Sequence, residues 1–397
     1  MTTDESKGPL SRNVKALAAV SLLTDAASEM IYPLLPLFLS SVLGASASVI
    51  GTIEGFAEST ASMLKLVSGW WSDRAGRRKP FVVAGYGLAA LVRPLMGLAQ
   101  APWQALVVRL SDRTGKGIRT SARDALLADS ALPSLRGRAF GFLRAGDNAG
   151  AVIGPLVAWV MLELGAVPLR TVFLWAALPG VLAVVVLVAL VKERPLLQSQ
   201  LRAGSPAALL AERRLGAPFW RYLVVLLVFT LGNSTDAFLL LRASQLGVAT
   251  ALVPILWAAF SLVKAVCSTP GGALSDRIGR RPVIVAGWAL FAGVYLLFGR
   301  ATTAWQAWAL FTVYGVSLGI TESVEKALVA DLVPAAHRGA AYGWYNFVIG
   351  IGSLPASVVF GIVWDRVSPA AAFTMGASLV GAAAIGLFTM VPRSLPE

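Results

Sequence analysis

Residues 69–78 read Gly69-Trp70-Trp71-Ser72-Asp73-Arg74-Ala75-Gly76-Arg77-Arg78, and residues 272–281 read Gly272-Ala273-Leu274-Ser275-Asp276-Arg277-Ile278-Gly279-Arg280-Arg281. Further matches recur at nearly the same offset. Trp103-Gln104-Ala105 returns as Trp305-Gln306-Ala307, and Ala128-Asp129 followed by Arg136-Gly137 returns as Ala330-Asp331 followed by Arg338-Gly339. Several matches at one offset of about 202 residues indicate that a structural unit has been duplicated.

The composition of the 397-residue chain is typical of a membrane protein. Hydrophobic residues make up 56% of the chain and charged residues only 14%, whereas about 25% of an ordinary soluble domain is charged. Apolar stretches of roughly 20 residues recur along the whole sequence, and each is long enough to cross the hydrocarbon core of a bilayer. We therefore expect an all-α membrane protein that has the lipid bilayer as its partner.

Hydropathy, together with breaks at Gly, Pro and charged residues, predicts twelve transmembrane helices in two pseudo-symmetric six-helix bundles. The first six are expected near residues 14–42, 48–71, 81–99, 103–128, 139–163 and 169–191. The second six are expected near residues 220–244, 249–274, 282–299, 304–330, 340–364 and 369–391. The predicted domains are residues 1–191 and 219–397, joined by a central cytoplasmic linker at 192–218.

Positive charge alternates between successive loops. Arg and Lys gather near residues 74–79, 136–138, 192–218, 277–281 and 338, whereas the turns between these loops are short and mostly uncharged. The positive-inside rule then places both termini in the cytoplasm. We expect a multi-pass protein of the cell inner membrane, and we expect it to be monomeric.

Several classes of function are not supported by the sequence. The net charge of +13 comes from short clusters between apolar stretches, and it does not form the basic patch with interleaved aromatic residues that nucleic-acid binding requires. One Cys and one His exclude a disulfide framework and a Cys/His metal site. No nucleophile and base pair and no phosphate-binding loop is found, so we expect no enzyme activity and no cofactor.

The duplicated loop resembles the Gly-x-x-x-Asp-Arg-x-Gly-Arg-Arg signature of the major facilitator superfamily, and the resemblance covers essentially the whole chain. It implies a secondary active transporter that works by alternating access, in which the two loops act as gate latches. The gating residues that it implies are Gly69, Asp73, Arg74, Gly76 and Arg77 in the first half, and Gly272, Asp276, Arg277, Gly279 and Arg280 in the second. The alternative is a pair of basic turns that only fix the topology.

The predicted span 103–128 carries charges at steps of three and four, which place them in one broad stripe of a helix. They are Arg109, Asp112, Arg113, Lys116, Arg119, Arg123 and Asp124. A charge at membrane depth costs about 2.5 to 3.5 kcal/mol, so these side chains must pair or face water. The alternative is a set of buried ion pairs that only hold the bundle together.

We interpret this stripe as part of a solute site, because spans 1, 4, 7 and 10 line the central cavity in the family that the chain resembles. The predicted substrate-binding residues are Arg113, Lys116, Arg119 and Arg123, with Asn233, Asp236 and Glu322 in the second half. Such a set favours a small organic solute with an anionic or zwitterionic group.

Proton coupling needs a carboxylate that takes up and releases a proton during the transport cycle. Asp25 and Glu29 are four residues apart in the first span, and Glu325 lies in the tenth. We predict that these three residues couple transport to protons.

Two alternatives to a transporter of organic anions stay open. Gly141, Gly150 and Gly154-Pro155 resemble a motif of antiporters in the superfamily, although Ala158 and Trp159 stand where two further glycines are expected. This motif suggests a multidrug/proton antiporter, or simply close packing of helices. A non-transporting membrane sensor or assembly factor is the alternative from another class, but it would have no need of two gate loops.

Overall fold

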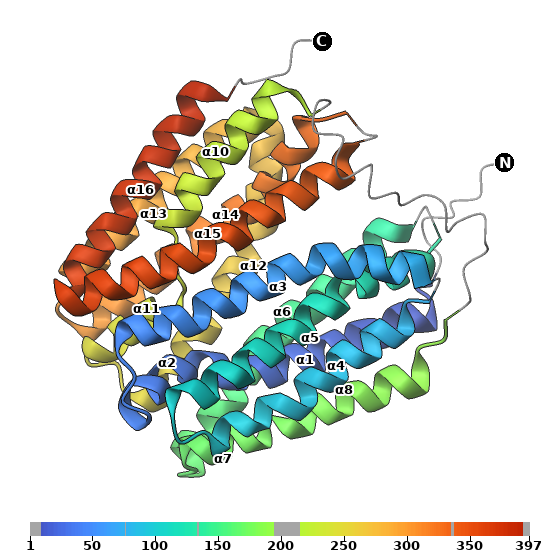
Figure 1. The fold of residues 1–397 in the computed structure, drawn as a ribbon, viewed down its shortest axis with the longest axis horizontal. Coiled ribbons are helices and arrows are strands. Elements are labelled where there is room, and N and C mark those ends of the chain that lie inside the picture. Colours follow the sequence, from blue (N-terminus) through green and yellow to red (C-terminus); the bar gives the residue numbers. More distant parts are fainter. Residues whose placement is uncertain (1–8, 76, 133–134, 194–214, 335–336, 392–397) are drawn as a thin grey trace. The chain divides into compact units, whose positions relative to one another are not determined.

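The computed structural model describes residues 9–75, 77–132, 135–193, 215–334 and 337–391, and within these ranges the chain is helical without any strand (Figure 1). The first half forms six long helical segments. They are α1 (Arg12–Ile31) continued by η2 (Tyr32–Leu34), α2 (Leu35–Leu37) and η3 (Phe38–Val42); α3 (Ala47–Ala75); α4 (Lys79–Val92) with η4 (Arg93–Leu98); α5 (Pro102–Asp129); α6 (Arg136–Trp159) with η6 (Val160–Leu164); and α7 (Leu169–Trp175) with α8 (Ala177–Leu190).

The second half forms six further segments. They are α10 (Gly216–Gly232) with α11 (Ala237–Gln245); η8 (Thr250–Leu252) with α12 (Val253–Ile278); α13 (Arg280–Arg300); α14 (Ala304–Asp331); α15 (Arg338–Arg366); and α16 (Pro369–Met390). Ten of the described segments are long and apolar enough to cross a membrane, and α3 and α5, which carry charges along their length, complete the set. The predicted all-α fold with twelve membrane helices is confirmed, and each predicted end agrees with the structure to within four residues.

Packing divides the chain into two compact units. The first unit comprises Met1–Tyr32 and Met63–Gly204, and the second comprises Pro33–Ser62 and Ser205–Glu397. Residues 47–62 of α3 therefore belong to the second unit and residues 63–75 to the first. Residues 194–214 of the predicted linker lie outside the described residues, and the predicted domain boundaries at 191 and 219 stay a prediction.

Within each unit the helices pack in pairs. In the first unit α1 lies against α6 and α8, and α4 lies against α5 (Figure 1). In the second unit α12 lies against α14, α13 against α14 and α16, and α10 against α15 and α16. A hydrophobic core cluster of the first unit is formed by aliphatic residues of α1, α4, α5, α6 and α8 together with the buried ring of Tyr86 on α4.

The internal repeat is visible in equivalent ion pairs. Arg78, just before α4, pairs with Asp129 at the end of α5. Arg280, at the start of α13, pairs with Asp331 at the end of α14, with 3.2 Å between Nε and Oδ2. The two pairs span the same number of residues, and both join the loop of the repeated signature to the following charged helix. The duplication inferred from the sequence thus extends to three-dimensional contacts.

Candidate transport site

The charged stripe of α5 faces the interior of the first unit. Arg109, Asp112 and Arg119 are each about 3–5% exposed and Arg113 is 8% exposed. Such burial of four charges on one helix is expected only where they are paired or reserved for a ligand.

Asp112 is the centre of a buried ion-pair cluster. Its Oδ1 lies 2.7 Å from Nε of Arg93, which comes from η4, and its Oδ2 lies 3.7 Å from Nη1 of Arg109. Nη1 of Arg93 also donates to the backbone carbonyl of Thr24 on α1, at 2.9 Å. One carboxylate therefore faces two guanidinium groups and ties α5 to η4 and, through Arg93, to α1.

Two further guanidinium groups of α5 are buried, and each has a nitrogen atom without a hydrogen-bond partner among the described residues. The guanidinium of Arg119 lies over the ring of Tyr86, 4.4 Å from its centroid. Among the described residues, Nη1 of Arg119, Nε of Arg113 and the hydroxyl of Tyr86 have no hydrogen-bond partner. An unsatisfied buried donor costs about 1–3 kcal/mol. These atoms are consequently suited to receive the oxygens of an anionic ligand.

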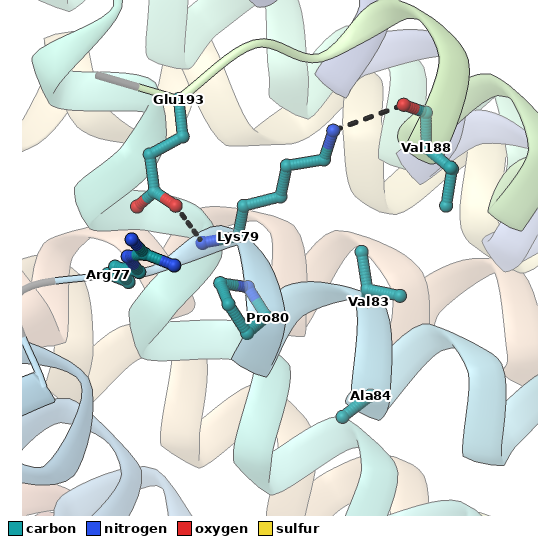
Figure 2. A pocket seen from close by; sticks show the side chains of 7 residues that line it. All are labelled: Arg77, Lys79, Pro80, Val83, Ala84, Val188 and Glu193. Carbon is teal, nitrogen blue, oxygen red and sulfur yellow. Dashed lines mark hydrogen bonds between the residues drawn. The ribbon is translucent and has the colours of Figure 1, made fainter. Parts of the chain in front are cut away.

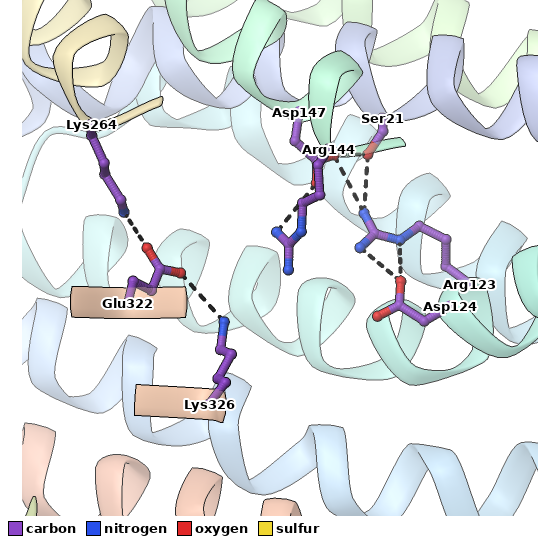
Figure 3. A network of polar contacts seen from close by, with 8 residues as sticks. All are labelled: Ser21, Arg123, Asp124, Arg144, Asp147, Lys264, Glu322 and Lys326. Atoms are coloured by element: carbon purple, nitrogen blue, oxygen red, sulfur yellow. Dashed lines mark hydrogen bonds and ion pairs between the residues drawn. The ribbon is translucent and has the colours of Figure 1, made fainter. Parts of the chain in front are cut away.

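Arg123 lies in a different environment, within a network that joins α1, α5 and α6 (Figure 3). Its guanidinium pairs with Asp124 at 2.9 Å and with Asp147 at 3.7 Å, and it donates to Oγ of Ser21 at 3.0 Å. Ser21 in turn donates to Asp147, which also faces Arg144 at 3.5 Å. Arg123, predicted to bind substrate, is thus held by acids of its own unit.

A cavity of about 200 Å³ opens among the helices of the second unit. It is lined by Leu226, Phe229, Thr230, Asn233, Lys264, Leu318, Thr321, Glu322, Glu325, Ile349 and Ser353. The structure therefore brings together three residues that the sequence predicts for a site, namely Asn233, Glu322 and Glu325. The hydroxyl groups and Lys264 were not assigned to the site, because single Thr, Ser and Lys residues in apolar helices carry no distinctive spacing.

Glu322 lies between two lysines at the wall of this cavity (Figure 3). Its Oε2 is 2.7 Å from Nζ of Lys264 on α12, and its Oε1 is 3.5 Å from Nζ of Lys326 on its own helix. All three side chains are more than one third exposed. An exposed pair of this kind contributes little to stability, so its charges are available to a solute in the cavity.

Glu325, one turn along α14, is buried and contacts only neutral donors among the described residues. Trp288 Nε1 donates to its Oε1 at 2.8 Å, and the hydroxyl of Tyr345 donates to its Oε2 at 3.1 Å. The side chain is 6% exposed. Glu322 and Glu325 therefore differ sharply, since the first is salt-bridged in the cavity and the second is held by an indole and a phenol.

The seventh span is interrupted where the sequence predicted a continuous helix. Between α10 and α11 the backbone leaves the helical conformation at Asn233, which has φ −91° and ψ 86°. Asp236 follows at the start of α11, and its carboxylate accepts a 2.6 Å hydrogen bond from the hydroxyl of Tyr314. Broken helices commonly form substrate and ion sites in transporters. The sequence analysis did not predict this break, although the polar run Asn233-Ser234-Thr235-Asp236 is a signal that could have indicated it.

The predicted proton-coupling residues of the first span lie on α1. Asp25 is within electrostatic reach of Asp147, Arg119, Lys116 and Arg123. Glu29 lies one turn further along the helix and interacts with other residues.

The predicted gate residues are only partly described. Gly76 lies outside the described residues. Gly69 and Asp73 belong to α3, but the surroundings of Gly69 and the side chain of Asp73 are outside what the structure describes. In the second loop, Gly279 adopts a positive φ of 94° that lets the chain turn between α12 and α13. Arg280 then pairs with Asp276 as well as Asp331. Arg277 and Gly272 lie on the last two turns of α12.

The glycines of the fifth span bring two helices into contact. Backbone atoms of α1 lie so close to Gly150 of α6 that an added Cβ would be 2.5 Å from the carbonyl oxygen of Leu22. Gly146 and Gly154 face the same helix in the same way, whereas a Cβ on Gly141 would meet nothing within 4 Å. Small residues at such contacts are typical of tightly packed membrane helices.

A twelve-helix membrane fold in two repeats, with charged residues buried in both, defines the class of polytopic membrane transporters. The family model described as Major Facilitator Superfamily matches residues 17–256 and 222–397. The chain is 33% identical over 385 residues to an uncharacterised MFS-type transporter of Methanocaldococcus jannaschii, covering 95% of this chain and 94% of that protein. The chain belongs to the major facilitator superfamily.

Two other comparisons are informative. The chain is 28% identical over 350 residues to the multidrug resistance protein MdtG of Enterobacter lignolyticus, covering 85% of this chain and 80% of that protein. The solved structure of a D-xylose–proton symporter superposes with a TM-score of 0.75 at 14% identity, covering 96% of this chain and 98% of that one. The second likeness concerns the fold alone. The protein is thus a multi-pass membrane transporter whose family handles small solutes.

Proposed function

We propose that the protein is a proton-coupled secondary active transporter, which moves a small organic solute with an anionic or zwitterionic group across the inner membrane by alternating access. The observation that carries this proposal is the pair of buried guanidinium groups at Arg113 and Arg119, with donor atoms unpartnered among the described residues. A charge-assisted hydrogen bond to a carboxylate or phosphate oxygen would satisfy each donor.

The two units offer different chemistry to such a solute. In the first unit the buried charge near Arg113 and Arg119 is mainly cationic, because Asp112 is already engaged by Arg93 and Arg109. In the second unit the cavity offers a carboxylate and a lysine side by side, together with hydroxyl and amide groups. We assign Lys116, Asn233, Asp236 and Glu322 to solute binding, and we assign Arg123 to the support of α5.

Glu325 is our first candidate for the proton-carrying group. Its carboxylate is buried, lines the cavity and accepts its hydrogen bonds from the neutral groups of Trp288 and Tyr345. A buried carboxylate that is not in direct contact with a cation is costly to keep charged, which favours exchange of a proton with the cavity. Asp25 and Glu29 stay candidates because they are acids at membrane depth beside the cationic stripe.

The duplicated loops are proposed to latch the gate on the cytoplasmic side, with both termini on that side. Arg78–Asp129 and Arg280–Asp331 are equivalent charge pairs at the ends of equivalent helices. Paired charges that can separate and re-form are suited to a rocking motion of the two repeats.

A multidrug/proton antiporter is the second candidate. It is favoured by the likeness to MdtG and by the glycine contacts of α6 with α1. A site for lipophilic cations would, however, gain nothing from the buried guanidinium groups of Arg113 and Arg119, because like charges repel.

A stability screen of the purified protein discriminates between these candidates, since a ligand that binds the folded state raises the melting temperature. The panel should contain monocarboxylates, dicarboxylates, sugar phosphates, amino acids and lipophilic cationic drugs. We expect an anionic or zwitterionic compound to raise the melting temperature, and we expect Arg113→Gln and Arg119→Gln to remove that shift. Stabilisation by cationic drugs alone, unchanged in both variants, would favour the multidrug antiporter instead.

A further inference from the structure

A second cavity lies in the first unit, where the start of α4 meets the end of α8. It has a volume of about 690 Å³ and is lined by Arg77, Lys79, Pro80, Val83, Ala84, Val188 and Glu193 (Figure 2). Val83 and Ala84 belong to α4 and Val188 to α8, and together they form an apolar wall. The basic residues stand at one end of this groove, beside the loop of the repeated signature.

The charges around the groove do not cancel, because two cations, Arg77 and Lys79, face the single carboxylate of Glu193. The carboxylate of Glu193 accepts hydrogen bonds from the backbone N–H groups of Arg78 and Lys79, the latter at 3.1 Å, and so it caps the start of α4. Nζ of Lys79 donates to the carbonyls of Val188 at 3.1 Å and Val191 at 2.6 Å. An ammonium group has three N–H donors, so one has no partner among the residues that the structure describes here.

Arg77 is the second cation at the groove. Its side chain is exposed, and no hydrogen bond or ion pair joins it to any residue that the structure describes. The pairing of the repeats explains why it is left over. Arg78 pairs with Asp129 as Arg280 pairs with Asp331. These pairs shift the two loops by one residue relative to the sequence match of 69–78 with 272–281, so by its contacts Arg77 takes the place of Gly279 and not of Arg280.

In the second half, the place that corresponds to this groove is occupied by a side chain. Arg281 donates to the carbonyl of Val391 at 2.7 Å, just after α16, as Lys79 donates to Val191 after α8. Three residues before each carbonyl stand Phe388 and Val188, respectively. The ring of Phe388 lies 4.8 Å from the guanidinium of Arg281. An aromatic ring therefore occupies the place that Val188 leaves open in the first half.

We propose that this groove binds an anionic phospholipid of the surrounding membrane. Its phosphate contacts the guanidinium of Arg77 and the remaining donor of Lys79, and one acyl chain lies along Val83, Ala84 and Val188. Gly87 lies one turn beyond Val83 and Ala84 on α4, and a Cβ added there would meet nothing within 4 Å, so space continues along this helix. Basic pockets between membrane helices at the cytoplasmic surface have the chemistry that anionic headgroups require.

Native mass spectrometry of the full-length protein in detergent, titrated with dioleoylphosphatidylglycerol, measures this binding. Each basic residue near an anionic lipid surface contributes about 1 kcal/mol, so Arg77→Gln should weaken the highest-affinity lipid about fivefold. Val188→Phe copies the second half and should weaken it without any change of charge. Ala84→Leu fills the same groove from α4. It replaces Val188→Phe in the test if that variant does not fold. Arg300→Gln removes one exposed arginine at the opposite end of a span in the second unit and should leave binding unchanged.

Two further titrations identify the source of the phosphate. Dioleoylphosphatidylcholine should bind more weakly than phosphatidylglycerol, and inorganic phosphate at the same concentration should not displace the lipid. The proposal is overturned if Arg77→Gln and both groove-filling variants bind phosphatidylglycerol like the parent protein. It is also overturned if inorganic phosphate competes as well as the lipid does, because the apolar groove would then contribute nothing.

Discussion

Two arginines of α5 that lie one turn apart have different surroundings. Arg123 is held by Asp124 and Asp147, whereas Arg119 stacks on Tyr86 and keeps a buried donor without a partner among the described residues. The spacing of these charges along the sequence predicted one stripe, and all of them do lie on one helix. The sequence could not separate the two arginines, because their partners come from α4 and α6, which are distant along the chain.

Asp112 provides a test of the buried ion-pair cluster. Asp112→Asn keeps the shape of the side chain but leaves Arg93 and Arg109 without their shared carboxylate. Removing one partner of a buried ion pair costs about 3–5 kcal/mol. We expect a loss of this size in the free energy of unfolding, measured with denaturant in detergent.

Asp124→Asn is the matched control, because Asp124 lies on the same helix, pairs with Arg123 and is 39% exposed. A partly exposed pair contributes about 0–1 kcal/mol. Equal losses in the two variants would show that the Asp112 cluster is not buried in the way described.

Glu325 provides the test of proton coupling. Glu325→Gln keeps the volume and an oxygen that can accept from Trp288 Nε1, so the protein should fold and insert normally. It removes the exchangeable proton, and uphill uptake driven by a pH gradient into proteoliposomes should fall to background while solute exchange persists. Glu163→Gln, on the exposed turn η6, is the control and should transport normally. Uphill transport at the parent rate in Glu325→Gln would assign coupling to another group.

Helix α4 approaches α5 so closely that there is no room for a side chain at one position. A Cβ added to Gly85 would lie 2.5 Å from the carbonyl oxygen of Gly115 and 2.6 Å from Cβ of Arg119. The same contact is built at the equivalent place in the second half, where Oγ of Ser317 donates to the carbonyl of Gly287 at 2.8 Å. This approach fixes the position of Arg119 within the first unit.

Gly85→Ala and Gly87→Ala form a matched pair on this helix. Gly85→Ala should separate α4 from α5 and lower the free energy of unfolding by about 1–3 kcal/mol, the usual cost of overpacking. Gly87→Ala meets nothing within 4 Å and should leave stability unchanged or raise it, because Ala has the higher helix propensity. Melting temperatures in one detergent compare them directly, and a loss of stability in Gly87→Ala but not in Gly85→Ala would contradict the packing described.

The elements themselves were predicted closely, and the reason is physical. A bilayer demands about 20 apolar residues per span, so the length and the ends of each helix are visible in the sequence. The interruption of the seventh span was not predicted, because the apolar residues of α10 and α11 on either side of Asn233 form one continuous hydropathy signal. The local backbone conformation there depends on contacts such as Tyr314 with Asp236, which join residues far apart in the sequence.

Taken as a whole, the molecule is a duplicated unit whose two copies have diverged in their charges. The repeat predicted from the signature loops reappears in the Arg78–Asp129 and Arg280–Asp331 pairs. The buried charged groups of the two copies differ, however. Helix α5 carries a cluster of buried guanidinium groups, whereas α14, the equivalent helix of the second copy, carries a buried glutamate. Duplicated folds of this kind commonly transport by exposing one site to each side of the membrane in turn.

Ser353 offers the most direct test of alternating access, because it lines the cavity of the second unit and Cys is nearly isosteric with Ser. Ser353→Cys should be made in a Cys267→Ala background, which removes the one native thiol, and treated with a membrane-impermeant maleimide in vesicles of each orientation. Val185→Cys, on the exposed outer face of α8, should resist the reagent in both. We predict that Ser353→Cys is labelled from either side of the membrane. Labelling from one side only, in the presence and absence of a pH gradient, would contradict transport by alternating access.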